Sequence, residues 1–123
     1  MEDLYCKIFI NTNLSIDILT ENISNFLSLE YDKYFSIKGD LFTIDVRKNK
    51  EFEEENSKTL IDGFLYYRYF LDMDLSDYYR KEEYKLIVGK LMEFLWGEGY
   101  LVVASCDFEN ELPNRGGYNK NIN

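Results

Sequence analysis

Carboxylates are the residues in this sequence whose spacing offers the most chemistry. Asp72 and Asp74 stand two residues apart behind an apolar run, so their side chains point the same way in an extended chain. A carboxylate pair can transfer protons or hold magnesium or calcium. The sequence contains no histidine, which excludes serine-histidine and cysteine-histidine nucleophile systems and removes the commonest metal ligand.

The segment Asp72-Met73-Asp74-Leu75 resembles the nucleophile motif of haloacid-dehalogenase phosphatases. Those enzymes begin with the strand that carries this motif, and a later lysine and paired acids complete the site on a Rossmann-like sheet. Here the segment lies in mid-chain, and a helix-capping residue follows it. We interpret it as a solvated strand end before a helix, and we expect no enzymatic activity, no metal and no cofactor.

The two cysteines give no reason to change that expectation. Cys6 and Cys106 lie near opposite ends of the chain in apolar, strand-like surroundings. Two cysteines without histidine are too few for a structural zinc site. We expect two small buried thiols rather than a disulfide.

The charge balance points to the class of partner. Acidic residues outnumber basic ones 23 to 14, giving a formal net charge of −9. Such a surface repels nucleic-acid phosphates and anionic lipids and attracts cationic proteins. We therefore expect neither direct nucleic-acid binding nor membrane binding. The start of the sequence resembles no signal peptide, and no apolar stretch approaches the roughly 20 residues that cross a bilayer, so we expect a cytoplasmic protein.

The acidic residues fall into three segments that are candidates for partner binding. They are the loop residues Glu51, Glu53, Glu54 and Glu55, the strand-end pair Asp72 and Asp74, and the alternating set Asp107, Glu109 and Glu111, which would point the same way in an extended chain. If the segments converge, they form a negative patch that docks on a basic surface. The alternative is a set of solubilising charges scattered over edges and loops.

Hydrophobic periodicity predicts the elements that must position these residues. We expect strands over 4–10, 31–38, 41–48, 64–73 and 100–108, helices over 16–29 and from about 77 to 97, a hairpin turn at Gly39-Asp40, and an acidic loop over 50–62. The order β-α-β-β-β-α-β predicts an α+β fold of ferredoxin-like type, with one mostly antiparallel sheet of about five strands and two helices on one face. We expect residues 1–112 to form a single domain and 113–123 a flexible tail. In this arrangement the first and last strands are neighbours.

Aromatic side chains define a second candidate surface. Tyr66, Arg68 and Phe70 alternate along one predicted strand, opposite its more aliphatic side. If the helices cover the aliphatic side, these three residues lie on the open face of the sheet. Tyrosine and arginine are enriched at binding hot spots, because they combine apolar area with directional hydrogen bonds. The alternative is that the tail or a second subunit buries this face.

Three segments in the second half of the chain resemble immunity proteins of bacterial polymorphic toxin and contact-dependent inhibition systems. They are the aromatic run Gly63–Tyr69, the helical run Lys90–Trp96 and the closing run Cys106–Pro113. The resemblance implies a small cytosolic protein that binds and neutralises one cognate toxin domain. Many such toxins are cationic nucleases, and an acidic inhibitor can place carboxylates where phosphates would bind.

Three hypotheses follow. The first is an inhibitor of a basic toxin domain, which uses the three acidic segments and the aromatic residues. The second is a small regulatory or ligand-binding domain, with a homodimer as one form, that uses the open sheet face. The third is a carboxylate-dependent enzyme with magnesium. The sequence names neither the toxin, nor its activity, nor the place where it is inhibited.

Overall fold

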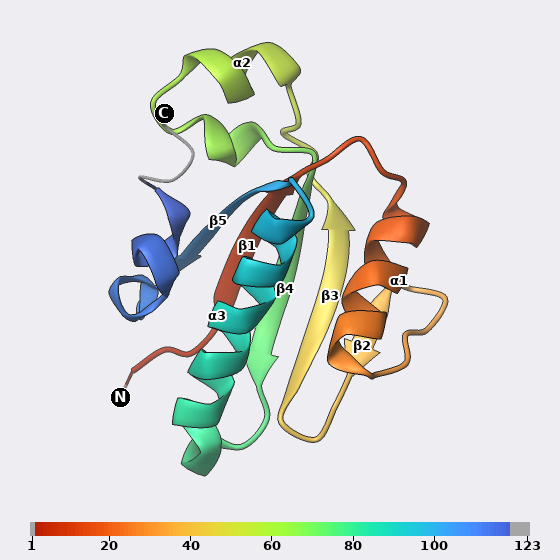
Figure 1. Cartoon of the computed structure of the whole chain (residues 1–123), viewed down its shortest axis with the longest axis vertical. Helices are drawn as coiled ribbons and strands as arrows, with labels where there is room; N and C mark the ends of the chain where they lie inside the picture. Colours follow the sequence, from red (N-terminus) through yellow and green to blue (C-terminus); the bar gives the residue numbers. More distant parts are fainter. Residues whose placement is uncertain (1, 119–123) are drawn as a thin grey trace.

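The computed structural model describes residues 2–118, which form one sheet with two long helices packed on the same face (Figure 1). The strands are β1 (Cys6–Asn11), β2 (Ser36–Lys38), β3 (Phe42–Lys48), β4 (Tyr69–Leu75) and β5 (Leu101–Cys106), and the α-helices are α1 (Ile16–Leu27), α2 (Glu54–Thr59) and α3 (Lys81–Gly97). The strand order is β2-β3-β4-β1-β5, and every neighbouring pair is antiparallel. The predicted α+β class and the single antiparallel sheet are confirmed.

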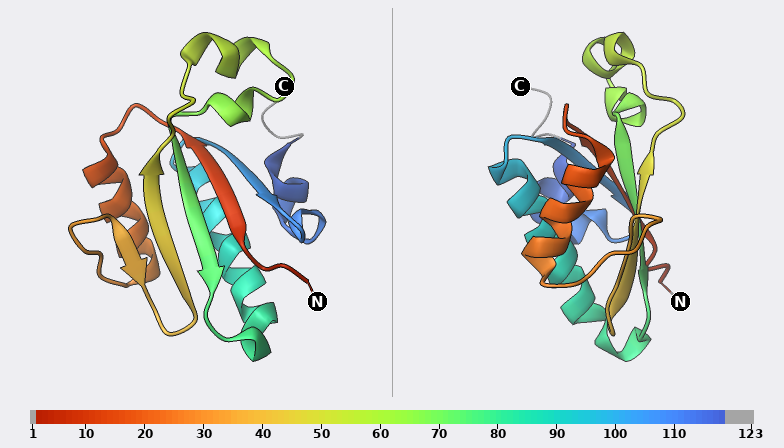
Figure 2. Two further views of the ribbon diagram at one scale, coloured as in Figure 1. Left: turned by 180° about the vertical axis from the view of Figure 1, so that it is seen from behind. Right: turned by 90° about the vertical axis from the view of Figure 1, so that its right-hand side faces the viewer.

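The core lies between the sheet and the helices α1 and α3, which the right-hand view of Figure 2 shows on one side of the strands. Alternate residues of each strand point into it, so Ile8, Leu71 and Ile44 of three neighbouring strands are fully buried. From the helices, Ile23 and Val88 meet them with no exposed surface. Each helix has one apolar stripe, and the predicted helical periodicity is confirmed.

The first and last strands are neighbours, as expected. Cys6 of β1 lies directly opposite Cys106 of β5, and both thiols are free. The hydrogen bond to Cys106 and burial raise the pKa of the Cys6 thiol well above its usual value. Cys6 is fully buried and Cys106 half-buried, so the pair contributes mainly to packing.

The connection between β3 and β4 differs from the prediction. The expected acidic loop contains α2, and the first part of the expected aromatic strand forms a 3-10 helix, η1 (Gly63–Tyr66), so β4 begins only at Tyr69. Glu53 caps α2 by accepting the backbone N–H groups of Glu55 and Asn56. A Cβ on Gly63 would lie 2.5 Å from the carbonyl oxygen of Ser57, so glycine permits this close packing of η1 on α2.

Two other predicted strands are shorter than expected. β2 spans three residues, because Asp32 accepts hydrogen bonds from the N–H groups of Tyr34 and Ser36 and turns the chain before the strand. β5 ends at Cys106, where the chain turns into a 3-10 helix, η3 (Glu109–Glu111). Local side-chain hydrogen bonds therefore replace part of each predicted ladder.

The start of the predicted flexible tail is packed along β5. Residues Pro113–Gly117 form a kinked series of turns, η4, in which Asn114, Arg115 and Gly116 have positive φ. Its Gly116 and Gly117 are buried beside the carbonyl groups of Ala104 and Val102. Tyr118 packs edge-on against the ring of Phe64, with 5.2 Å between centroids. As far as Tyr118 the tail is part of the fold, and its remainder, 119–123, lies outside the described residues.

Candidate functional site

Register places two contrasting rows of side chains on the open face of the sheet, the face turned away from α1 and α3. The left-hand view of Figure 2 looks onto this face. One row is apolar over most of its length and runs from Phe70 through Phe9 to Val103. The next row is polar and runs from Asp45 through Asp72 to Lys7 and Ser105, and Asp74 lies two residues beyond Asp72 on β4.

The apolar row is largely covered. Phe9 is 5% exposed, and Phe64 of η1 packs edge-on against it with 5.3 Å between ring centroids. Tyr118 extends the same cluster beyond Phe64. The ammonium of Lys7 lies 4.2 Å from the centroid of the Phe70 ring. The connection between β3 and β4, together with residue 118, therefore covers the part of the apolar row around Phe9.

Four carboxylates from three segments of the chain lie on or beside the polar row, which also contains Lys7 directly opposite Asp72. Asp45 of β3 lies directly opposite Asp72 of β4, an arrangement that is unfavourable for two carboxylates. The Asp74 side chain is exposed, but the partial desolvation of its carboxyl group raises the pKa of that group. The negative charges of Asp72, Asp45 and Asp3 raise this pKa further. We call these four carboxylates, Asp3, Asp45, Asp72 and Asp74, the acidic face.

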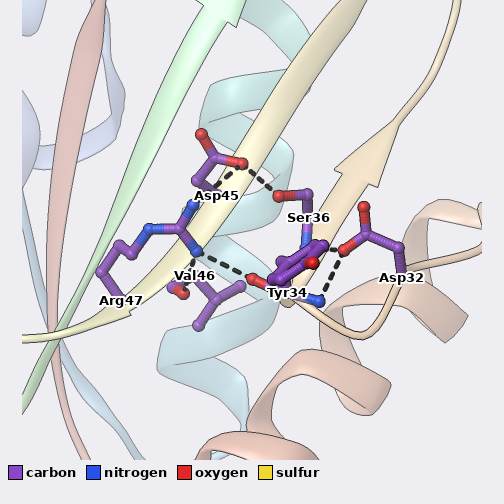
Figure 3. A network of polar contacts seen from close by, with 6 residues as sticks. All are labelled: Asp32, Tyr34, Ser36, Asp45, Val46 and Arg47. Atoms are coloured by element: carbon purple, nitrogen blue, oxygen red, sulfur yellow. Dashed lines mark hydrogen bonds and ion pairs between the residues drawn. The ribbon is translucent and has the colours of Figure 1, made fainter.

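The two sides of the acidic face are neutralised to different degrees. Asp45 accepts a hydrogen bond from the Ser36 hydroxyl, and its Oδ1 lies 3.5 Å from Nη2 of Arg47 (Figure 3). The same guanidinium donates to the carbonyl oxygens of Tyr34 and Val46, which hold it against the edge of the sheet. Within residues 2–118, no ion pair involves the central acids of the acidic face, Asp72 and Asp74.

A tyrosine supports the middle of the acidic face. The Tyr5 hydroxyl donates a hydrogen bond to Oδ1 of Asp72. Burial raises the pKa of Tyr5, and the hydrogen bond to Asp72 raises it further, so the phenol stays protonated and remains a donor. This hydrogen bond fixes the orientation of the Asp72 carboxyl group.

The three predicted acidic segments do not converge. Lys48 pairs with Tyr69 at one end of the β3–β4 ladder and Thr43 pairs with Asp74 towards the other, so the segment containing Glu51, Glu53, Glu54 and Glu55 lies at the opposite end of the sheet from Asp74 (Figure 1). Glu53 caps α2, and Glu54 is paired with Lys58 at 3.3 Å. Of the two alternatives, one patch or scattered charges, the loop segment fits the second, because the connection between β3 and β4 carries it away from Asp72 and Asp74.

Asp107, Glu109 and Glu111 do not point the same way either, since η3 replaces the expected extended chain. Asp107 is an exposed turn residue. Glu109 accepts a hydrogen bond from the Tyr118 hydroxyl at 3.0 Å, and Glu111 lies 2.9 Å from the ammonium of Lys85. Two of these three acids thus hold the C-terminal segment in place.

The predicted aromatic anchors are also separated. Tyr66 lies in η1 instead of on β4, so it shares no strand face with Phe70. The Arg68 guanidinium lies 4.5 Å from the centroid of the Phe52 ring, and its backbone N–H donates to Asn11. Phe70 alone of the three lies on a strand of the open face. The prediction failed because the run of aromatic residues has strand propensity on both sides of a turn.

Two members of the acidic face were missed by the sequence analysis. Asp45 alternates with Ile44 and Val46, so its position on the open face follows from the pattern of the strand 41–48. Its place beside Asp72 depends on register between distant strands, which carries no local signal. Asp3 precedes the first strand and gives no signal at all.

Three further comparisons, for metal sites, for membrane-spanning helices and for similar proteins, assign no family or function to the chain. Within the described part of the chain, no group of three or more His, Cys, Asp or Glu residues is placed to hold a metal ion. Among the helices of residues 2–118, none has the length and apolar character needed to cross a membrane. No protein-family model matches the sequence, and comparisons with curated proteins and with solved structures gave no match.

Proposed function

We propose that this protein is a binding protein that receives a cationic protein partner on the acidic face. The observation that carries the proposal is the convergence of four carboxylates from the N-terminal segment, β3 and β4 on one solvent-accessible surface. The raised pKa of Asp74 reflects burial and the repulsion from Asp72, Asp45 and Asp3. Lysine or arginine side chains of a partner would relieve this repulsion on binding.

Electrostatics also gives the proposed mode of association. A chain of net charge −9 attracts cationic proteins over long range, and a local concentration of carboxylates orients the partner as it arrives. Asp72 and Asp74 contribute most, because neither is committed to an ion pair within residues 2–118. Phe70 adjoins this surface and supplies apolar contact at its border, where its ring also holds the Lys7 ammonium at 4.2 Å.

The partner that fits best is a toxin domain with a basic cleft, and the protein then acts as its cytoplasmic immunity protein. Support comes from the resemblance of the second half of the sequence to immunity proteins and from the acidic surface. Carboxylates on a rigid sheet can occupy positions where a nuclease holds phosphates. The surface is smaller than the sequence predicted, because the loop 50–62 lies at the other end of the sheet.

We also propose that the fold is ferredoxin-like with β2 as an addition at the edge. Without β2 and the short helix α2, the chain order is β1-α1-β3-β4-α3-β5 and the order in the sheet is β3-β4-β1-β5. Each helix then connects two strands that enclose a third, as in two interlocked split β-α-β units. This arrangement leaves the face opposite the helices available for partners.

The test is co-purification of the tagged full chain with the products of the neighbouring genes, each expressed in turn. We expect one cationic domain to be retained at low salt and released at high salt. Replacing Asp72 and Asp74 by asparagine should weaken binding by about 30-fold, from about 1 kcal/mol for each lost charge pair.

The matched control replaces Glu21 and Glu93 by glutamine. Both residues are exposed on the helix layer, and the change in net charge is the same. If this control weakens binding as much as the Asp72/Asp74 variant, binding reflects overall charge and the proposed face is wrong. Retention of no cationic domain at either salt concentration would contradict the proposed function itself.

A further inference from the structure

The connection between β3 and β4 is longer than its topology requires. Adjacent antiparallel strands can be joined by a two-residue turn, yet residues 49–68 separate these two. The segment is held in place at its base, where the Asn49 side-chain amide donates to the carbonyl oxygens of Leu65 at 2.9 Å and Tyr67 at 2.7 Å. This connection, residues 49–68, is a long loop segment that Phe64 fixes to the sheet, and segments of this kind commonly carry binding sites.

This excursion buries Tyr67 and packs Phe64 against the sheet, but it leaves other apolar side chains exposed. Ile61 is 97% exposed, Leu60 44% and Leu65 40%, and no residue of α2 is buried. A groove of about 620 Å³ adjoins them, with Phe64 and Tyr118 among its lining residues. We call this groove and its exposed rim the apolar groove, made by Leu60, Ile61, Phe64, Tyr67, Val103 and Tyr118. Exposed apolar groups around a groove mark a site where another molecule is bound.

The chemistry of the surroundings selects the occupant. Residues 50–62 carry five acidic and two basic side chains, which are Glu51, Glu53, Glu54, Glu55 and Asp62 against Lys50 and Lys58. Two copies of this surface would bring like charges together, which disfavours self-association. The charged residues that line the groove, Lys58 and Asp62, balance each other, and the net negative charge comes from the neighbouring residues 50–57. A partner segment with apolar side chains on one side and lysine or arginine on the other complements both the groove and this neighbouring negative charge.

The secondary structure around the groove selects the conformation of that segment. A strand could add only to a free sheet edge, and here Gly116 and Gly117 lie against the outer carbonyl groups of β5, while β4 is paired on both sides. An amphipathic helix needs no free edge, because it inserts side chains at spacings of three and four residues. We propose that the apolar groove binds a basic amphipathic helix of a partner protein. This surface lies at the opposite end of the sheet from Asp74 and does not rest on the proposed function of the acidic face.

The probe is a synthetic, fluorescently labelled helical peptide of leucine and lysine in amphipathic order, added to the full chain. Two control peptides carry glutamate in place of lysine, or the same composition in scrambled order. We expect saturable binding of the basic amphipathic peptide alone, with amide chemical-shift changes centred on residues 57–67 and 118. Ile61→Ser should weaken binding by about tenfold, the effect of losing one large apolar contact. Because Ile61 is almost fully exposed, this variant keeps the fold, which circular dichroism verifies.

Four results would overturn the proposal. The first is no saturable binding of the basic amphipathic peptide, and the second is equal binding of the scrambled peptide. The third is binding that is lost with Asp72→Asn/Asp74→Asn and kept with Ile61→Ser, which would place the peptide on the acidic face. The fourth is a dimer in solution that Ile61→Ser dissociates, which would make a second copy the occupant. The proposed function of the acidic face survives the first and fourth results, so the failure of one proposal is distinguishable from the failure of the other.

Discussion

Asp74→Asn should stabilise the folded protein. Asparagine keeps the size of the side chain and removes a charge that Asp72, Asp45 and Asp3 repel. Surface substitutions usually destabilise or have little effect. A gain in stability at this position therefore identifies a surface where the fold tolerates like charges, as binding surfaces commonly do at the expense of stability.

The size of the effect follows from the geometry of the strand. Residues two apart on one strand face are separated by about 7 Å, and two unit charges at that distance repel by about 0.6 kcal/mol in water. Asp74 is exposed, so its interactions lie near this aqueous limit and are screened by salt. We expect a gain of about 0.5 kcal/mol at low ionic strength, which raises the Tm of a chain of this length by about 2–3 °C.

Thermal unfolding between pH 3 and pH 7 provides the assay, since the sign of the pH dependence is fixed. The pKa of Asp74 is raised in the folded state, so the folded protein binds this proton more tightly than the unfolded chain does. The contribution of Asp74 to the stability of the unaltered protein therefore falls as pH rises from the unfolded pKa, about 3.9, through the folded value. Asp74→Asn should remove this loss, and its advantage should vanish in acid, where Asp74 is protonated in both states.

The control is Glu93→Gln, an exposed change of the same charge on α3, which should leave the Tm unchanged at each pH. A lower Tm for Asp74→Asn would show that its carboxylate is stabilising and would refute the reasoning. A gain that persists unchanged in acid or in high salt would also refute it, because the cause would not be charge.

Three further predictions concern the packing around the sheet. Lys85→Met keeps the apolar stem but removes the ammonium that lies 3.1 Å from Glu2 and 2.9 Å from Glu111. Urea unfolding should show that the free energy of unfolding falls by about 2 kcal/mol, and a fall below about 0.5 kcal/mol would contradict this prediction. Gly117→Ala places a methyl group 2.5 Å from the Val102 carbonyl oxygen at a φ of +93°, so it should cost about 2–3 kcal/mol. Gly97→Ala should cost nothing, because beyond its neighbours in the chain and the backbone of its own helix no atom lies within 4 Å of the added Cβ; equal effects of the two changes would contradict this reading. Oxidised glutathione should form a Cys6–Cys106 disulfide slowly at neutral pH and faster at alkaline pH, because the hydrogen bond to Cys106 and burial raise the pKa of the Cys6 thiol. The intact mass should then show the loss of two hydrogen atoms. Cys106→Ser should abolish this disulfide. Rapid oxidation at neutral pH would show that the thiol is more reactive than its surroundings imply.

Periodicity predicted the elements whose side chains meet one core. β1, β3, α1 and α3 each have one buried face, and burial of that face fixes a regular spacing that the sequence displays. Asp72 and Asp74 followed from the same alternation on β4. These predictions succeeded because the information lies within one element.

The connection between β3 and β4 could not be predicted in this way. Residues 64–67 have the aromatic composition of a strand, but Gly63 allows a close turn and Asn49 binds the carbonyl groups of Leu65 and Tyr67. The convergence of Asp3 and Asp45 on Asp74 likewise depends on register between strands distant in sequence. Contacts between distant residues decide both features.

The most direct test of the acidic face is the rate at which the full chain associates with the cationic domain recovered by co-purification. At low salt, Asp72→Asn/Asp74→Asn should slow association at least about tenfold, and Glu21→Gln/Glu93→Gln should change it far less. High salt should bring the three proteins to nearly the same rate. Equal rates for all three at low salt would contradict the role of the acidic face.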